Sequence, residues 1–189
     1  MGLFRAVLAT LYLSCGGGTI LPPAPPDIGD VSLPALLPAM GKLVNAQISH
    51  APEVTLHFDS PGGDIMAMRA FAALMHRIEE SGTKIVCVVD GDAGSAAFYL
   101  LQQCSERVAH PGSRFLWHQY SALLRENAYT ARELEEIARE LRAGSHEASV
   151  EIAKRLRISA DELERRIADR DYFFDAREAL EIGAIDRIQ

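Results

Sequence analysis

Ser95 is the residue of this chain that is best placed to act as a nucleophile. It lies in the segment VVDGDAGSAAFYLL, where an expected buried strand turns into an expected helix. A serine at such a turn lies at the C-terminal edge of a parallel sheet, where α/β active sites are found. Small neighbours would admit a peptide backbone, and the N–H of Ala96, at the helix N-terminus, would point toward a developing oxyanion. A serine that only caps the helix would have the same neighbours, so Ser95 alone does not identify an enzyme.

A second loop with suitable chemistry is Ser60-Pro61-Gly62-Gly63, which also follows a strand and precedes a helix. Paired glycines permit backbone conformations that direct N–H groups at a ligand. We therefore consider Gly63 as the second oxyanion donor beside Ala96. An ordinary strand-to-helix turn is the alternative reading of this loop.

His118 and Asp171 supply the remaining chemistry of an activated serine. His118 ends the expected strand RFLWH, and a histidine at a strand end is a candidate general base. Asp171 lies in DRDYFF, between two expected helices, where its carboxylate could hold an imidazole in one tautomer. A packed histidine and a surface acid are the alternatives. Only the set of nucleophile, base, orienting acid and two oxyanion donors points to hydrolysis.

The elements that must position these residues follow from hydrophobic periodicity. Alternation predicts a strand around residues 54–58, and helical spacing predicts helices from Ser32 to about Val44, kinked at Pro38, and from Ile65 to Gly82. Further along we expect these elements: a strand over 84–89, a tight turn over 90–94, a helix over 95–103, strands at 107–109 and 114–117, a long amphipathic helix after Thr130, and short helices after Ser159 and Asp175. Thr130 to Glu133 and Ser159 to Glu162 match the capping-box pattern. Strands that alternate with helices predict an α/β fold with a mostly parallel sheet.

Composition limits the classes of function. The 189 residues are enough for one domain with a hydrophobic core, and the formal net charge of -7 argues against nucleic-acid binding. The three cysteines, at irregular spacing, argue against a disulfide framework. No cysteine or histidine pair has the spacing of zinc ligands, so we expect no metal.

Four motifs together resemble the proteolytic subunit of the Clp protease, ClpP, over roughly residues 29–188. They are SPGG at 60–63, GDAGSAAF at 91–98, PGSRFLWHQ at 111–119 and DRDYFFDAREALEIGAID at 169–186. The resemblance implies the ClpP/crotonase-type fold of repeated β-β-α units, with a long helical handle where two rings meet. It implies a Ser95-His118-Asp171 serine endopeptidase in a homo-oligomeric ring, with peptide or unfolded protein as substrate. No cofactor is implied, and a Clp-type ATPase partner is one expectation that the family suggests.

Residues 1–28 form an apolar and Gly/Pro-rich arm outside the matched domain of residues 29–189. The apolar run Ala6–Leu13 before Cys15 resembles a short lipoprotein signal, with Cys15 as the lipid-bearing residue. The alternative is a hydrophobic arm of a cytoplasmic protein, which the family resemblance suggests. Both readings stay open.

Three other functions share parts of the pattern. A signal-peptide-peptidase-like enzyme would have an SPGG-like loop but a lysine base. A crotonase-type acyl-CoA enzyme would use the oxyanion loops and leave Ser95 idle. A catalytically silent ClpP-like ring subunit would keep the fold and lose the activity. A serine-directed fluorophosphonate probe separates them, because only an activated serine is labelled.

Overall fold

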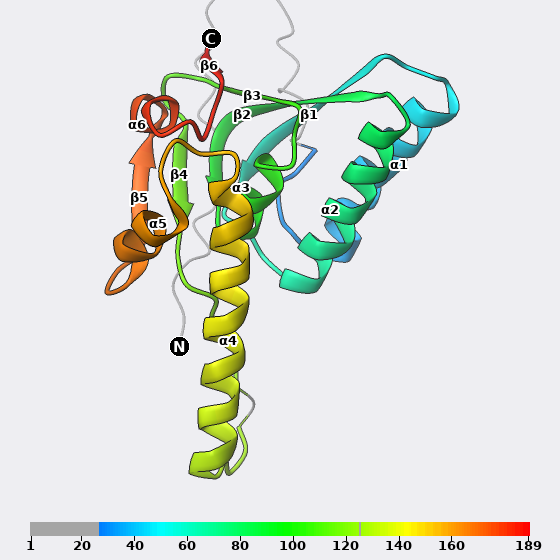
Figure 1. Ribbon diagram of the computed structural model, residues 1–189. Helices are drawn as coiled ribbons and strands as arrows, with labels where there is room; N and C mark the ends of the chain where they lie inside the picture. Colours follow the sequence, from blue (N-terminus) through cyan, green and yellow to red (C-terminus); the bar gives the residue numbers. More distant parts are fainter. Residues whose placement is uncertain (1–26, 125) are drawn as a thin grey trace, which may run out of the picture.

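The computed structural model describes residues 27–124 and 126–189, in which one six-stranded sheet organises the chain (Figure 1). The strands are β1 (Glu53–Ser60), β2 (Lys84–Gly94), β3 (Glu106–Ala109), β4 (Arg114–Trp117), β5 (Tyr172–Asp175) and β6 (Arg187–Ile188). The order is β5-β4-β2-β3-β6, with β1 also paired to β2. Only the β4–β5 pair is antiparallel. The predicted α/β fold with a mostly parallel sheet is therefore confirmed.

Strand β2 continues through the segment where we predicted a tight turn. The first half of β2 pairs with β3, whereas Asp92, Ala93 and Gly94 pair with β4. The predicted turn over 90–94 is wrong, because small and polar residues extend the strand once β4 supplies a ladder of hydrogen bonds. Ser95 follows directly, so this extension places the nucleophile candidate at the C-terminal end of a central strand.

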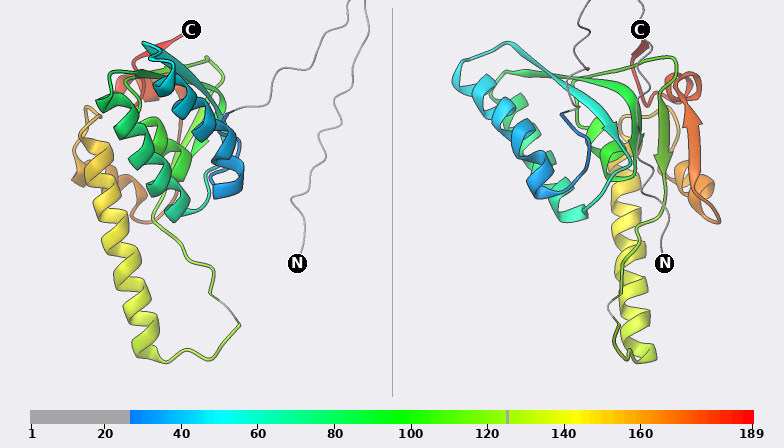
Figure 2. Two further views of the ribbon diagram at one scale, coloured as in Figure 1. Left: turned by 90° about the vertical axis from the view of Figure 1, so that its right-hand side faces the viewer. Right: turned by 180° about the vertical axis from the view of Figure 1, so that it is seen from behind.

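Helices cover the sheet mainly on one side (Figures 1 and 2). They are α1 (Leu33–Ile48), α2 (Ile65–Glu80), α3 (Ala96–Leu101), α4 (Ala131–Ala153), α5 (Ala160–Ile167) and α6 (Ala176–Glu181). Alternate residues of β1 (Val54, Leu56 and Phe58) are buried in the core that α1, α2 and α3 complete. None of the described helices is long and apolar enough to cross a membrane.

The first helix forms as its apolar spacing predicts, with two differences. Ser32 is the residue before α1, but its hydroxyl donates to Asp30 instead of capping the helix. Pro38 lies inside α1, which continues without a break over sixteen residues. Leu36 and Leu43 are buried, whereas Leu33 and Leu37 on another face are exposed. One face of α1 therefore joins the core and another meets solvent.

Helix α4 extends away from the body of the domain like a handle (Figure 2). Its N-terminus carries the predicted capping box: Thr130 Oγ1 accepts from the Glu133 N–H, and the Glu133 carboxylate accepts from the Thr130 N–H at 2.8 Å. The second predicted box is only half formed. Ser159 Oγ accepts from the Glu162 N–H, but the Glu162 carboxylate pairs with arginines of its own helix.

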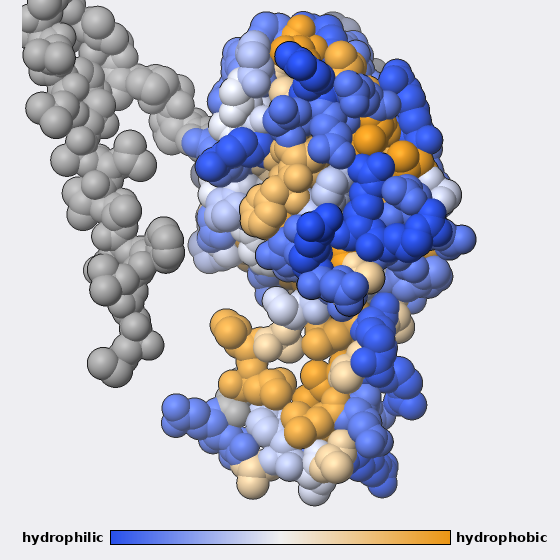
Figure 3. Space-filling view, turned by 90° about the vertical axis from the view of Figure 1, so that its left-hand side faces the viewer, coloured by the Kyte–Doolittle hydropathy of each residue, from blue (hydrophilic) through white to orange (hydrophobic). Residues whose placement is uncertain are grey.

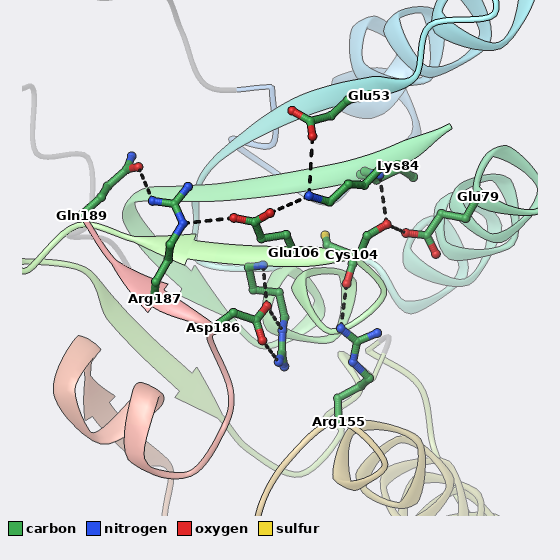
Figure 4. A network of polar contacts seen from close by, with 12 residues as sticks. Glu53, Glu79, Lys84, Cys104, Glu106, Arg155, Asp186, Arg187 and Gln189 are labelled. Atoms are coloured by element: carbon green, nitrogen blue, oxygen red, sulfur yellow. Dashed lines mark hydrogen bonds and ion pairs between the residues drawn. The ribbon is translucent and has the colours of Figure 1, made fainter. Parts of the chain in front are cut away.

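The C-terminal segment is anchored by a polar network on the β3 side of the sheet (Figure 4). The buried Arg107 guanidinium donates two hydrogen bonds to the Asp186 carboxylate, at 2.7 and 3.1 Å. Farther out, Glu106 pairs with Lys84 at 2.6 Å and with Arg187 at 3.0 Å. These contacts fix β6 beside β3 and tie three distant parts of the chain together.

Cys87 of β2 and Cys104, which follows α3, form a disulfide with Cα atoms 6.0 Å apart. This corrects the expectation, drawn from the odd cysteine count, that the chain has no disulfide framework. Both cysteines are fully buried. The bond joins the two ends of the segment that contains Ser95.

Candidate active site

The backbone of Ser95 has an uncommon conformation. Its φ of 51° and ψ of -118° belong to a region that non-glycine residues rarely adopt, and such strain clusters at active sites. The Ser95 N–H donates to the Leu116 carbonyl at 2.8 Å, which continues the β2–β4 ladder. Ser95 is partly exposed, and its hydroxyl forms no cap bond to α3. The side chain is therefore not consumed by the helix-capping role considered above.

The glycine loop lies directly against the Ser95 turn. A Cβ atom built on Gly62 would lie 2.7 Å from Ser95 Cβ and 3.0 Å from the Ala96 nitrogen. A Cβ on Gly94 would lie 2.7 Å from the Pro61 carbonyl oxygen. Only glycine permits this approach, and the φ of 113° at Gly62 also favours glycine. The structure thus brings together the two loops that the sequence analysis singled out.

The two candidate oxyanion donors have free N–H groups within the described part of the chain. Val31 bonds to both neighbours of Gly63: its N–H donates to the Gly62 carbonyl at 3.0 Å, and its carbonyl accepts from the Asp64 N–H at 2.6 Å. The N–H of Gly63 itself donates to no described residue, and neither does the N–H of Ala96. Both groups therefore lack an internal acceptor, and Gly63 and Ala96 each adjoin a residue of the Gly62–Ser95 contact.

His118 follows the last residue of β4 and is partly buried. Its Nδ1 lies 2.5 Å from the carbonyl oxygen of Gln119, so Nδ1 carries the hydrogen of the neutral ring. That tautomer leaves Nε2 unprotonated, as a general base requires. No hydrogen bond joins His118 to Ser95 among the described residues.

Asp171 precedes β5 and is exposed. The structure does not bring its carboxylate into hydrogen-bond contact with His118. The antiparallel register nonetheless pairs Trp117 with Tyr172, so His118 and Asp171 occupy the next facing positions. The Gln119 carbonyl could not be predicted as the acceptor of the Nδ1–H, because a backbone acceptor leaves no signal in residue type.

An aromatic cluster supports the strands that carry these residues. The Phe98 ring of α3 contacts Phe174 of β5 edge-on, with ring centroids 5.4 Å apart, and Phe115 of β4 stacks on Phe174 at 5.3 Å. Trp117 packs on Phe98 with centroids 5.9 Å apart. Because α3 begins right after Ser95, this packing connects the nucleophile turn to β4 and β5. The described residues hold no group of three or more His, Cys, Asp or Glu side chains placed to bind a metal ion.

The structure thus places a strained serine beside a glycine loop at the end of a strand of a mostly parallel α/β sheet. Comparison with known proteins gives the family. Residues 39–189 match the model of the Clp protease family, and the chain belongs to that family.

Similar curated proteins carry related names. The chain is 30% identical over 143 residues to the ATP-dependent Clp protease proteolytic subunit 1 of Corynebacterium glutamicum. This alignment covers 72% of this chain and 64% of that protein. It is 31% identical over 137 residues to subunit 3 of Parasynechococcus marenigrum, and 33% identical over 137 residues to subunit 2 of Prochlorococcus marinus. Both of these alignments cover 71% of this chain and 66% of the relative. The chain therefore spans just under two thirds of the length of these relatives.

Proposed function

We propose that this chain is a serine peptidase in which Ser95 is the nucleophile, His118 the general base and Asp171 the orienting acid. The Ser95 hydroxyl attacks the scissile carbonyl while His118 Nε2 takes its proton, which then passes to the leaving amine. Water, activated by the same imidazole, hydrolyses the acyl-enzyme. Membership of the Clp protease family supports this reaction class.

The observation that carries the proposal is the contact between the glycine loop and the Ser95 turn. It brings Gly62 against Ser95, and the N–H groups of the adjoining residues Gly63 and Ala96 have no partner among the described residues. Two backbone donors beside a nucleophile suit the tetrahedral intermediate of acyl transfer, and one such donor is worth about 10²–10³ in kcat. A serine that only capped a helix would need neither the strain nor the second loop.

Labelling with a fluorophosphonate probe and a peptidase assay test the proposal. Ser95→Ala should abolish labelling and lower peptide turnover by about 10⁴-fold or more. Ser121→Ala, at an exposed serine beyond β4, is the matched control and should behave like wild type. Labelling that persists in Ser95→Ala would contradict the assignment.

We also propose that the chain works as a homo-oligomer that uses its handle. Apolar surface gathers on the handle, where the chain after β4 runs beside α4 (Figure 3). Leu123 is fully exposed there, and Leu124 and Leu134 are about half exposed. Association with other copies of the chain would bury this exposed apolar surface, and such burial favours assembly.

Light scattering tests the assembly. The double change Leu123→Gln and Leu124→Gln should lower the measured mass, while Leu37→Gln, at an exposed leucine of α1, should not. An active wild-type monomer would contradict the proposal. We further propose that the substrate is a peptide or an unfolded protein and that a Clp-type ATPase is a partner. An assay of ATP-dependent degradation of an unfolded protein tests both predictions.

A further inference from the structure

A hollow of about 290 Å³ between α4 and α5 adjoins the proposed catalytic residues. Its lining is formed by Gln119, Arg142, Ser145, His146, Ser149, Glu164, Ile167 and Ala168. Gln119 directly follows His118, and its amide nitrogen lies 3.4 Å from the Ile167 and Ala168 carbonyl oxygens. Asp171 is three residues beyond Ala168. A peptide held against His118 would therefore have this hollow beside it.

Two buried hydroxyl groups in the hollow have hydrogens to donate. Ser145 Oγ accepts the Tyr120 N–H at 2.7 Å, and Ser149 Oγ accepts the Trp117 Nε1–H at 3.3 Å. Neither hydroxyl donates to another described residue. Because buried donors normally find an acceptor, these two hydroxyls suit a ligand that brings acceptor atoms.

The lining holds one arginine and one acidic side chain, Arg142 and Glu164, and they differ in whether they already have a partner. Arg142 enters no ion pair with the described residues, so its guanidinium is available at the rim. The acid of the hollow is already engaged, since Glu164 Oε1 lies 2.6 Å from His146 Nδ1. Ile167 adds an apolar wall that methylene groups can contact.

We propose that this hollow binds an acidic side chain, Glu or Asp, of the peptide beside the bond that Ser95 attacks. The inference rests on the proposed peptidase function and names its substrate class. A carboxylate would accept hydrogen bonds from the two serine hydroxyls and pair with Arg142. A leucine in the same place would leave those donors unpaired, which is a larger loss than a missing apolar contact.

A second hollow of about 210 Å³ gives the competing outcome. Pro61, Phe115, Leu116 and Phe173 make it largely apolar, and Gly94 brings it next to Ser95. If substrate side chains entered this hollow instead, apolar peptides would bind better than acidic ones.

Peptides that differ only in one residue, Glu, Gln or Leu, decide between these outcomes. Their binding is measured by fluorescence anisotropy on the full chain carrying Ser95→Ala, and their kcat/KM on the chain with Ser95 intact. The Glu peptide should bind about tenfold more tightly than the Leu peptide, and Arg142→Gln should remove most of that difference. Arg139→Gln is the matched control, because Arg139 is on the same helix but pairs with Glu136 outside this hollow.

Equal or tighter binding of the Leu peptide would overturn the proposal, as would a Glu-to-Leu ratio that Arg142→Gln leaves unchanged. The binding ratio does not depend on turnover. Absent fluorophosphonate labelling of Ser95 would therefore refute the peptidase reaction, while the ratio would still decide what the hollow binds.

Discussion

His118 and Asp171 are the next facing positions of the β4–β5 ladder, one step beyond Trp117 and Tyr172. The His118 Nδ1–H is directed instead to the Gln119 carbonyl oxygen, at 2.5 Å. In the proposed mechanism the Asp171 carboxylate would take the place of this carbonyl as the acceptor of the Nδ1 hydrogen. A carboxylate stabilises the imidazolium that forms during acylation more strongly than a neutral carbonyl does. Extension of the ladder by one pair would exchange the weaker acceptor for the stronger.

Asp171→Asn should accordingly lower kcat/KM by about 10²–10⁴ while leaving the free energy of unfolding nearly unchanged, since Asp171 is exposed. Asp169→Asn, at an exposed acid two residues earlier, provides the comparison. A double change of His118 and Asp171 to Ala should cost little more than His118→Ala alone. Equal activity of the two asparagine variants would mean that the Gln119 carbonyl is the working acceptor.

Gly62→Ala should remove activity, because its methyl group would need the space held by Ser95 Cβ and the Gly94 oxygen, both 2.7 Å away. Gly82→Ala separates this clash from backbone strain. Gly82 also has a positive φ, 96°, but nothing lies within 4 Å of its Cβ position. The control should lose about 1 kcal/mol of stability and keep its activity. Peptidase assays and urea unfolding of both variants measure the difference.

The Cys87–Cys104 disulfide should stabilise the domain by about 3 kcal/mol, given a sequence separation of 17 residues. Urea unfolding with and without reductant measures this on the wild-type chain. Cys15→Ser should leave the stability unchanged, because the other two cysteines form the pair. When the protein is denatured without reduction, only one of its three cysteines should react as a free thiol. Three reactive thiols would show that the bond is absent.

Two N-terminal deletions should differ sharply. Removal of residues 1–26 keeps Ile28, which is fully buried and bonded on both sides to β1, and keeps the 2.8 Å pair of Asp27 with Lys42. Removal of residues 1–28 loses both, which should cost about 2–4 kcal/mol by urea unfolding. If the shorter deletion already unfolds the domain, the arm belongs to the core and the reading of Cys15 as a lipid anchor should be dropped.

The Arg107–Asp186 contact should make stability depend on acid pH. Burial raises the pKa of Asp186, but hydrogen bonds from Arg107 and its charge outweigh burial and hold the pKa below the ordinary 3.8. A lowered folded-state pKa gives stability that is present above the unfolded value and lost as the pH falls through the folded one. The stability gap between wild type and Asp186→Asn should therefore be constant near neutral pH and shrink below about pH 4. A gap that stays constant down to pH 2 would contradict this.

The elements that could be predicted from the sequence are those with a local signal, such as hydrophobic alternation or a capping pattern. Alternation at Val54, Leu56 and Phe58 gave β1, and the Thr130–Glu133 pattern gave the start of α4. Features that depend on a distant partner were missed. Residues 90–94 resemble a turn until β4 pairs with them, and Cys87 meets Cys104 only because α3 folds back over the sheet.

The candidate site divides in the same way. Residue types and chain order were enough to select Ser95, His118, Asp171, Gly63 and Ala96. They could not reveal which acceptor the His118 ring uses, because the Gln119 carbonyl belongs to the backbone. The hollow beside Gln119 was also hidden, since its lining comes from residues up to 49 positions apart.

Burial of both sulfur atoms gives the Cys87–Cys104 bond a further use. A small thiol in solution can attack it only when the segment between the two cysteines opens, since neither residue is exposed in the folded chain. The rate of thiol exchange in native buffer therefore measures how often the segment around Ser95 opens locally. A ligand that holds the serine turn closed should lower this exchange rate, whether or not any peptide is cleaved.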